Sequence, residues 1–199
     1  MNSSQFRTDS YTHVLIGDVV YALDRIEREN TPTHRRELIR AAFAGMEGLH
    51  WKLKRTVLDH ADRFVDLSIH ERAALLEETY SVDERGSVRV QSRFLSLPVA
   101  IRLVVNIVQR YSASYKVDFN HAGWSNLRAA AEVRNRLVHP KNLDDLQVSD
   151  LEIRQTASGF NWLVALVIEV NSETIAHFED QVSSLHDAVG RLSDSNAPS

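Results

Sequence analysis

The sequence predicts an all-α protein, a single bundle of five or six helices over residues 1–192 with a small hairpin or irregular insertion near residues 80–96. Three observations lead to this prediction. Apolar residues recur at intervals of three and four over most of the chain, which is the helical period. Only 7 Gly and 4 Pro occur among 199 residues, so tight turns are few. A hydrophobic content of 43% suffices for one sizeable core.

The first predicted helix covers residues 12–29, where the apolar side chains follow the helical period. Pro32 ends that helix and begins another, because a proline disfavours helix at the residue before it and suits the first helical position. Thr31 is therefore expected to cap a second helix over residues 32–65.

Two glycines of this second helix, Gly45 and Gly48, flank the carboxylate of Glu47. Glycine inside a helix costs about 1 kcal/mol relative to alanine, and close packing against another helix or chain would be a reason to keep it. The basic run at residues 52–55 is interpreted as a solvated helix face, which is the commoner role of such runs.

A short helix and a possible β-segment follow in the sequence. Ser68 and Glu71 have the spacing of a capping box, which predicts a helix continuing to about Glu78. Residues 80–90 then alternate around Gly86, which favours a small hairpin or an irregular excursion. A two-stranded hairpin is only marginally stable by itself, so it would have to lie on the helices.

Two apolar helices are predicted in the second half of the chain. Residues 97–111 carry a strongly buried pattern with Pro98 near the start. Residues 112–123 are polar and are expected to connect this helix to the next one, over residues 124–138. Pro140 stops that helix.

The last predicted helix is long. Ser149 and Glu152 repeat the capping-box spacing, and the apolar pattern continues to about Leu185 or beyond. Residues 193–199 form a polar tail that we expect to be disordered. Neither an internal repeat nor a domain linker is found, which supports a single domain over residues 1–192.

Composition restricts the function. The chain has no cysteine, which excludes disulfides and thiolate metal sites, and its histidines lack metal-ligand spacing, so we expect no metal and no cofactor. There is no Gly-rich phosphate loop. The N-terminal MNSSQFRTDS lacks an apolar run and no stretch is long enough to span a bilayer, so we expect a cytoplasmic protein. A net charge of -4 counts against tight non-specific nucleic-acid binding, so any such site must be a local patch.

Functional chemistry is concentrated in residues 131–141, AEVRNRLVHPK, at the end of a predicted helix. Arg134 and His139 are five residues apart, so on an ideal helix their side chains diverge by about 140°. Pro140 disfavours the helical conformation at His139, which places the histidine at or just past the helix end. There the imidazole could swing back toward the side of the arginine.

These side chains suit the cleavage of RNA without a metal. The reaction needs activation of the 2′-OH, stabilisation of charge on the phosphorane-like transition state and protonation of the leaving 5′-oxygen. His139 can transfer protons near neutral pH, Arg134 can grip phosphate oxygens, and Asn135 can orient either group. Because the reaction needs both an acid and a base, one copy is incomplete, and a two-fold dimer would supply the duplicates.

The string RNRLVHP at residues 134–140 resembles the signature of the HEPN family, an Arg followed by a polar residue and then a His. Residues 41–47 resemble the early helix of that family, which often carries an acidic residue facing the site, here Glu47. A long helix follows the motif in the family, as the helix from Ser149 does here. The resemblance covers residues 32–185.

The resemblance implies a single HEPN-like bundle that dimerises so that two Arg–His pairs line one cleft. It implies a metal-independent endoribonuclease that acts as a bacterial toxin, in phage defence or in RNA processing. The partners would be RNA, a second copy of the chain, and an antitoxin or defence-system protein. The resemblance assigns catalysis to Arg134, Asn135 and His139, and a weaker substrate-binding role to Glu47. The nearby cations Arg136 and Lys141 are either solvated charges or weak substrate-binding residues that guide phosphate.

One position departs from part of the family. Toxins silenced by a partner nucleotidyltransferase often have a tyrosine two residues after the His, and Lys141 stands there, so that regulation is not expected.

Other interpretations fit the same sequence. A non-catalytic HEPN-type module could bind RNA or a nucleotide or serve as an assembly surface. A plain helical interaction protein would use Arg134 as a surface residue, His139 as a helix cap and Glu47 as a salt-bridge partner. The tryptophans are expected to be core or interface residues.

Overall fold

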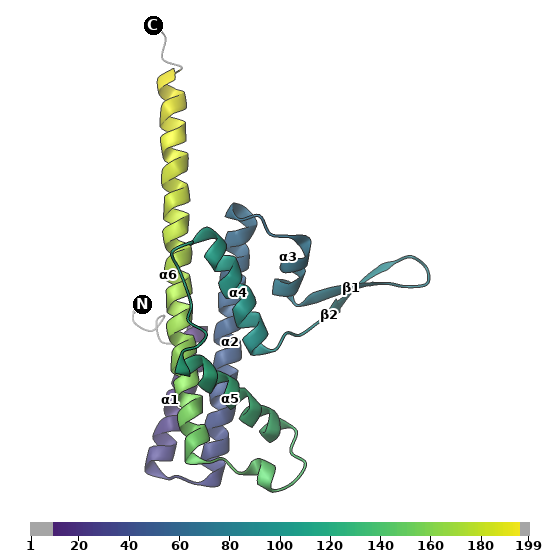
Figure 1. Ribbon diagram of the computed structural model, residues 1–199, viewed down its shortest axis with the longest axis vertical. Coiled ribbons are helices and arrows are strands. Elements are labelled where there is room, and N and C mark those ends of the chain that lie inside the picture. Colours follow the sequence, from purple (N-terminus) through teal and green to yellow (C-terminus); the bar gives the residue numbers. More distant parts are fainter. Residues whose placement is uncertain (1–9, 196–199) are drawn as a thin grey trace, which may run out of the picture. The chain divides into compact units, whose positions relative to one another are not determined.

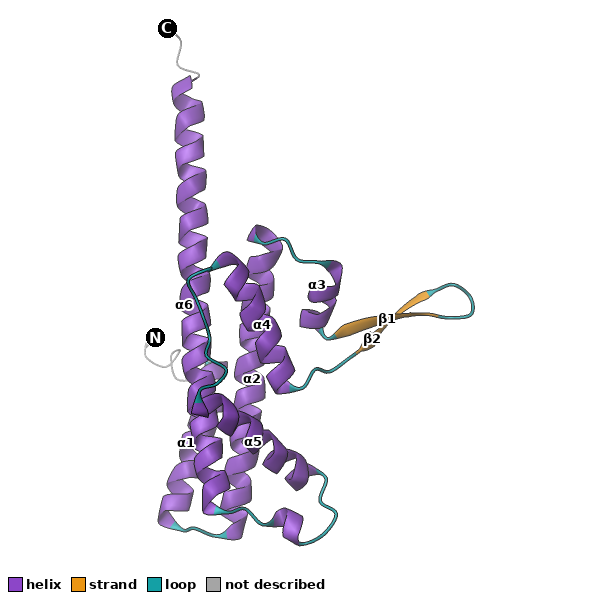
Figure 2. Cartoon of the chain, in the orientation of Figure 1, coloured by secondary structure: helices purple, strands orange, loops and turns teal. Residues whose placement is uncertain are grey.

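The computed structural model describes residues 10–195 and confirms the all-α prediction. Six α-helices and one two-stranded sheet make up the regular structure of the described residues, together with a 3₁₀ turn (Figure 2). The elements are α1 (Tyr11–Arg28), α2 (Pro32–Phe64), α3 (Ile69–Leu76), β1 (Glu78–Val82), β2 (Val88–Ser92), α4 (Leu97–Tyr111), α5 (Ala122–Val138), η2 (Asp144–Leu146) and α6 (Asp150–Ser195) (Figure 1).

The end of α6 bears on the predicted tail. The helix continues to Ser195, so residues 193–195 are helical, while the rest of the expected disordered tail, residues 196–199, lies outside the described residues. No helix of the described residues is long and apolar enough to cross a membrane.

The chain divides into two compact units, and the boundaries fall inside α2 and inside α6. Unit 1 comprises residues up to Lys52 and Asp118–Val167, and unit 2 comprises Leu53–Val117 and the residues from Ile168 onward. Unit 1 therefore holds α1, α5, η2 and the first parts of α2 and α6. Unit 2 holds α3, the sheet, α4 and the remaining parts of α2 and α6.

Both predicted capping boxes are present. The Ser68 hydroxyl accepts from the Glu71 amide while the Glu71 carboxylate accepts from the Ser68 amide, which starts α3. Ser149 and Glu152 make the same reciprocal pair at the start of α6. These bonds satisfy amides that the first turn of a helix leaves without partners, so the sequence determines where both helices begin.

Glycines mark where the helices of unit 1 lie closest together. A Cβ on Gly45 would lie 3.0 Å from the Phe160 ring, and one on Gly48 would lie 2.5 Å from Leu15. The expected close packing around Glu47 is therefore against α6 and α1. The backbones of α5 and α6 also approach each other closely, since a Cβ on Gly159 would lie 2.6 Å from the Cα of Leu127.

Unit 2 has its own core, formed by buried side chains of α4 with Leu53, Val57, Leu75 and Val170. It also contains an exception to the expected solvated basic face. Lys54 is only 5% exposed, and its ammonium lies 3.0 Å from a carboxylate oxygen of Glu77. A buried ammonium needs such a partner, because leaving its charge unpaired away from water is costly.

Two histidines form a buried polar contact in unit 2. The Nε2 of His60 lies 2.8 Å from the Nδ1 of His177, and the Tyr111 ring packs against both imidazoles. Burial, His177 and the positive charge of Arg63 lower the pKa of His60 below its ordinary value. A hydrogen bond between two ring nitrogens needs one nitrogen without a proton. The bond is therefore lost if both imidazoles are in the charged form.

We predict that Gly159→Ala destabilises the protein by about 1–3 kcal/mol, because the new methyl group would overlap the backbone of Leu127 rather than a flexible side chain. Urea denaturation would measure the change. Gly17→Ala is the matched control: a Cβ there meets nothing within 4 Å, so the same substitution in helix α1 should stabilise by about 0.5–1 kcal/mol. Equal effects at the two positions would contradict the close helix crossing.

We predict that the protein loses stability as the pH falls below 6.5, the ordinary pKa of histidine. The unfolded chain then takes up a proton at His60 while the folded chain, with its lowered pKa, does not, so protonation favours unfolding. Urea denaturation at about pH 7.5 and about pH 5.5 would measure the loss. His60→Gln should reduce this pH dependence, whereas His13→Gln, on the surface of α1, should leave it unchanged.

Candidate functional site

The sequence motif lies at the C-terminal end of α5, within unit 1. The helix stays α-helical through Val138, and His139 is its C-cap, with φ -125° and ψ 58°. The amide of His139 donates to the Asn135 carbonyl at 3.0 Å, so the helical bonding pattern ends at this residue. The placement of His139 at the helix end, expected from Pro140, is confirmed, and its side chain is exposed.

Arg134 is held by two of the residues that the sequence analysis selected. Its Nη2 lies 3.1 Å from Oε1 of Glu47 on α2, and its Nη1 donates to the Asn135 side-chain oxygen at 3.4 Å. The two ion-paired side chains remain 34% and 52% exposed. A pair this exposed adds only about 0–1 kcal/mol of stability, so its main effect is on where the guanidinium lies.

The guanidinium of Arg134 is still able to bind an anion. Arginine has five N–H donors, and the two bonds described use only two of them. The remaining donors of a partly exposed guanidinium can contact phosphate oxygens in the two-pronged way that ammonium groups cannot. Glu47 therefore positions the arginine without saturating it.

Arg136 lies on a different face of α5 and binds the protein itself. Its guanidinium donates to the Asp145 carbonyl at 3.1 Å, to the Gln147 carbonyl at 2.6 Å and to Glu152 at 2.9 Å. This places Arg136 against η2 and the first turn of α6, whereas Arg134 lies against α2. The sequence suggested a weak substrate-binding role for Arg136, but its donors are engaged in structural contacts.

Two arginines from the first turn of α2 bind the same segment. Arg35 donates to the Val148 carbonyl at 2.8 Å and is ion-paired with Asp150, and Arg36 donates to the Leu146 carbonyl at 3.4 Å. With Arg136, each of the four consecutive carbonyls of residues 145–148 has an arginine donor. We call this set of contacts the arginine clamp; it joins α2, α5 and the start of α6.

The segment after His139 is closed by an acidic side chain. The carboxylate of Asp145 accepts from the amides of Lys141 and Asn142, at 2.7 and 3.3 Å, and Asn142 accepts in return from the Asp145 amide. Lys141 thus contributes its backbone to the loop, and its side chain is exposed. Together with the arginine clamp, these bonds hold the loop that carries His139.

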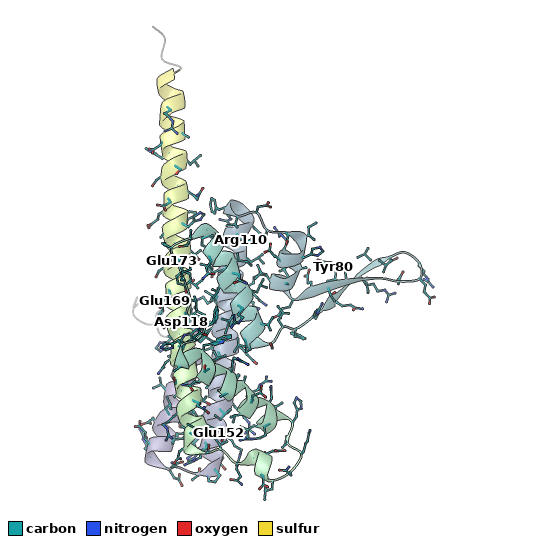
Figure 3. The ribbon with its side chains drawn as sticks, in the orientation of Figure 1. Tyr80, Arg110, Asp118, Glu152, Glu169 and Glu173 are labelled. Atoms are coloured by element: carbon teal, nitrogen blue, oxygen red, sulfur yellow. The ribbon has the colours of Figure 1, made fainter. Side chains whose placement is uncertain are left out.

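Glu152, labelled in Figure 3, links the clamp to the capping box of α6. Burial raises the pKa of its carboxyl, but the hydrogen bonds from Arg136 and Ser149 outweigh burial and hold that pKa below its ordinary value. The carboxylate therefore remains charged while it binds both partners.

The structure separates the selected residues into groups. It brings Glu47, Arg134 and Asn135 into contact and puts His139 one turn further along, where the helix ends. It turns Arg136 away into the clamp. Sequence reasoning missed Arg35 and Arg36, whose spacing gave no signal, because their partners are backbone carbonyls more than a hundred residues later.

Two other places bear on ligand binding. Among the described residues no group of three or more His, Cys, Asp and Glu side chains is arranged to hold a metal ion. A pocket of about 230 Å³ in unit 2 is lined mainly by apolar atoms of residues that include Phe64, Ile175 and Phe178, with His60 among them. It shares no residue with the motif.

Comparison with known proteins adds no relative: no protein-family model, no curated protein and no solved structure matches this chain.

We predict that Arg136→Gln lowers the stability of the protein by about 1–3 kcal/mol, because it removes a charged donor from two carbonyls and a carboxylate. Denaturation in urea would measure the loss, and hydrogen exchange should speed up across residues 141–149. Arg128→Gln, an exposed arginine of the same helix, is the matched control and should change stability by less than about 0.5 kcal/mol. Unchanged exchange in the loop would show that the clamp does not hold it.

Proposed function

We propose that the protein is a metal-independent endoribonuclease of the HEPN type, acting on cytoplasmic RNA in a toxin, phage-defence or RNA-processing role. The observation that supports this most is the end of α5. Arg134 is held by Glu47 and Asn135 with donors to spare, and His139 follows on the exposed helix cap. A cation for phosphate and an imidazole for proton transfer thus lie five residues apart at one helix end.

In this proposal the 2′-oxygen of the RNA attacks the adjacent phosphorus. A histidine acting as base takes the proton from the 2′-OH, the P–O5′ bond breaks, and an acid returns a proton to the leaving 5′-oxygen. The products are a 2′,3′-cyclic phosphate and a 5′-OH. The arginine stabilises the negative charge on the non-bridging oxygens of the transition state.

The reaction needs an acid and a base together, and each chain offers one His139. A closed two-fold dimer that faces two α5 ends would provide two imidazoles and two guanidinium groups. In that arrangement Asn135 orients the arginine and Lys141, on the loop after the histidine, attracts the RNA backbone. An antitoxin or defence-system protein would act by covering the same ends.

A second function is favoured by one observation. The guanidinium of Arg134 is already ion-paired with Glu47. A structural role for this pair suits a module that binds RNA or a nucleotide, or assembles with other proteins, without cutting RNA. Such a module would bind RNA without producing cyclic phosphate ends, and the binding would survive replacement of His139.

We predict that the purified protein cleaves RNA in EDTA and leaves 2′,3′-cyclic phosphate ends. His139→Ala and Arg134→Ala should each lower the cleavage rate about 100-fold or more, because each removes a group used in the transition state. His13→Ala and Arg128→Ala are matched controls on exposed positions of unit 1 and should cleave at the wild-type rate. Wild-type cleavage by both motif variants, with intact folds by circular dichroism, would exclude the proposal.

The requirement for two copies can be measured in the same assay. Suppose that each active site needs both His139 side chains. The activity of equilibrated mixtures of wild-type and His139→Ala chains should then be proportional to the square of the wild-type fraction. An equal mixture would then keep about one quarter of the activity rather than half. A linear loss would mean that each chain contains a whole site.

A further inference from the structure

The last part of α6 carries an apolar stripe that is largely exposed to solvent. Its members are between 44% and 66% exposed: Ile175 58%, Phe178 44%, Val182 48%, Leu185 66% and Val189 54%. Beyond Phe178 the described side chains are exposed up to Arg191, apart from half-buried Ala188. Figure 1 shows this end of α6, in yellow, continuing past the end of α2 and past α4. An isolated helix is marginally stable in water, so a helix this exposed calls for a partner.

The spacing of the stripe indicates what the partner is. Ile175, Val182 and Val189 are seven residues apart, and Phe178 and Leu185 repeat at the same interval, three residues after the first set. This is the heptad pattern of a coiled coil, in which two apolar positions, a and d, alternate at three and four. The sequence continues the pattern to Leu192.

The residue types at the two positions are also selective. All the a positions, Ile175, Val182 and Val189, are β-branched, and the d positions are Phe178 followed by Leu185 and Leu192. β-Branched residues at a with leucine at d favour two parallel strands over three or four. We infer that the end of α6 pairs with the same segment of a second copy as a parallel two-stranded coiled coil.

The side chains beside the stripe are compatible with this pairing. In a parallel pair, exposed Gln181 of one copy would face exposed His186 of the other. This pair does not juxtapose like charges. Asp180 and Asp187 fall at the positions furthest from the contact, where they stay in water.

A lipid surface fits the stripe poorly. Helices that lie on membranes present lysine and arginine on the polar face, opposite the apolar one. Here the polar residues of α6 from Glu169 to Arg191 include five carboxylates (Glu169, Glu173, Glu179, Asp180 and Asp187) against one arginine, Arg191. An acidic face would be repelled by anionic lipids, so a protein partner is the better match.

The stripe begins at the core of unit 2. The Phe178 ring packs on Phe64, the last residue of α2, with ring centroids 5.8 Å apart, and Ile175 and Phe178 line the apolar pocket there. The apolar surface of the pocket is thus continuous with the stripe. A second copy would cover the stripe beyond the point where α2 ends and no longer packs on it.

The coiled coil lies on α6 rather than on α5, so it would join two chains whatever the chemistry of the motif. Loss of the coiled coil and loss of cleavage can therefore be observed separately in the variants described.

We predict that the full chain is a dimer at tens of micromolar by light scattering coupled to size exclusion. Leu185→Asp should raise the dissociation constant at least tenfold, because it places a carboxylate in the apolar contact. Ser184→Asp, one residue away and off the stripe, is the matched control and should dimerise like the wild type. A monomeric wild type, or a dimer that Leu185→Asp leaves intact, would overturn the inference.

The orientation is testable because the chain has no cysteine of its own. Val182→Cys and Val189→Cys should each form disulfide-linked dimers under mild oxidation, since equivalent residues face each other in a parallel pair at a distance a disulfide can bridge. Asp187→Cys, on the outer face, should not. Cross-linking at one stripe position only indicates an antiparallel pair, and cross-linking at neither indicates a different interface; both results contradict the proposal.

Discussion

The candidate site depends on the arginine clamp. The segment between α5 and α6 contains only the short η2, and the carbonyls of residues 145–148 accept from side chains instead of from a helix or strand. Arg35, Arg36 and Arg136 supply them, and each charged donor provides more stabilisation than a neutral one. Because the donors come from α2 and α5 and the acceptors lead into α6, three helices of unit 1 meet at one peptide segment. The arginine clamp thereby also holds the loop that begins at His139, the residue that ends α5.

Within the seven-residue motif, the arginine that holds the backbone is not the arginine that can contact a ligand. Arg136 is committed to the backbone, and Arg134, two residues earlier, keeps donors for a ligand. Successive turns of a helix point side chains in different directions, so one short motif can both build a loop and present a cation beside it. The proposed ribonuclease requires two copies of this end, and the coiled coil proposed for α6 offers a way to keep two copies together.

Much of the fold could be predicted, because helical period and capping residues are local signals. Pro32, the Ser68 and Ser149 boxes, and Pro140 placed helix ends close to where they lie. The hairpin was one of two alternatives, and the structure decides for it. What failed was long-range: Lys54 looked solvated in a basic run, and only the fold brings Glu77 to it. Similarly, Arg136 was a candidate for substrate binding, because two of its partners are backbone carbonyls and the residue types in the sequence do not indicate such partners. Only the family resemblance linked Glu47 to the site, and the local sequence pattern did not indicate its contact with Arg134.

The hairpin of unit 2 illustrates a cost of a sheet with two strands. Tyr80 pairs with Val90 and Val82 with Val88, so four exposed apolar side chains share one face, and both strands are edges (Figure 3 labels Tyr80). Free edges beside an apolar face invite other strands to add, which is how many β-aggregates begin. Arg85, Arg89 and the adjoining acids Asp83 and Glu84 surround the turn with charge. Because salt screens the interactions of exposed charges, this ionic protection of the hairpin weakens as the salt concentration rises.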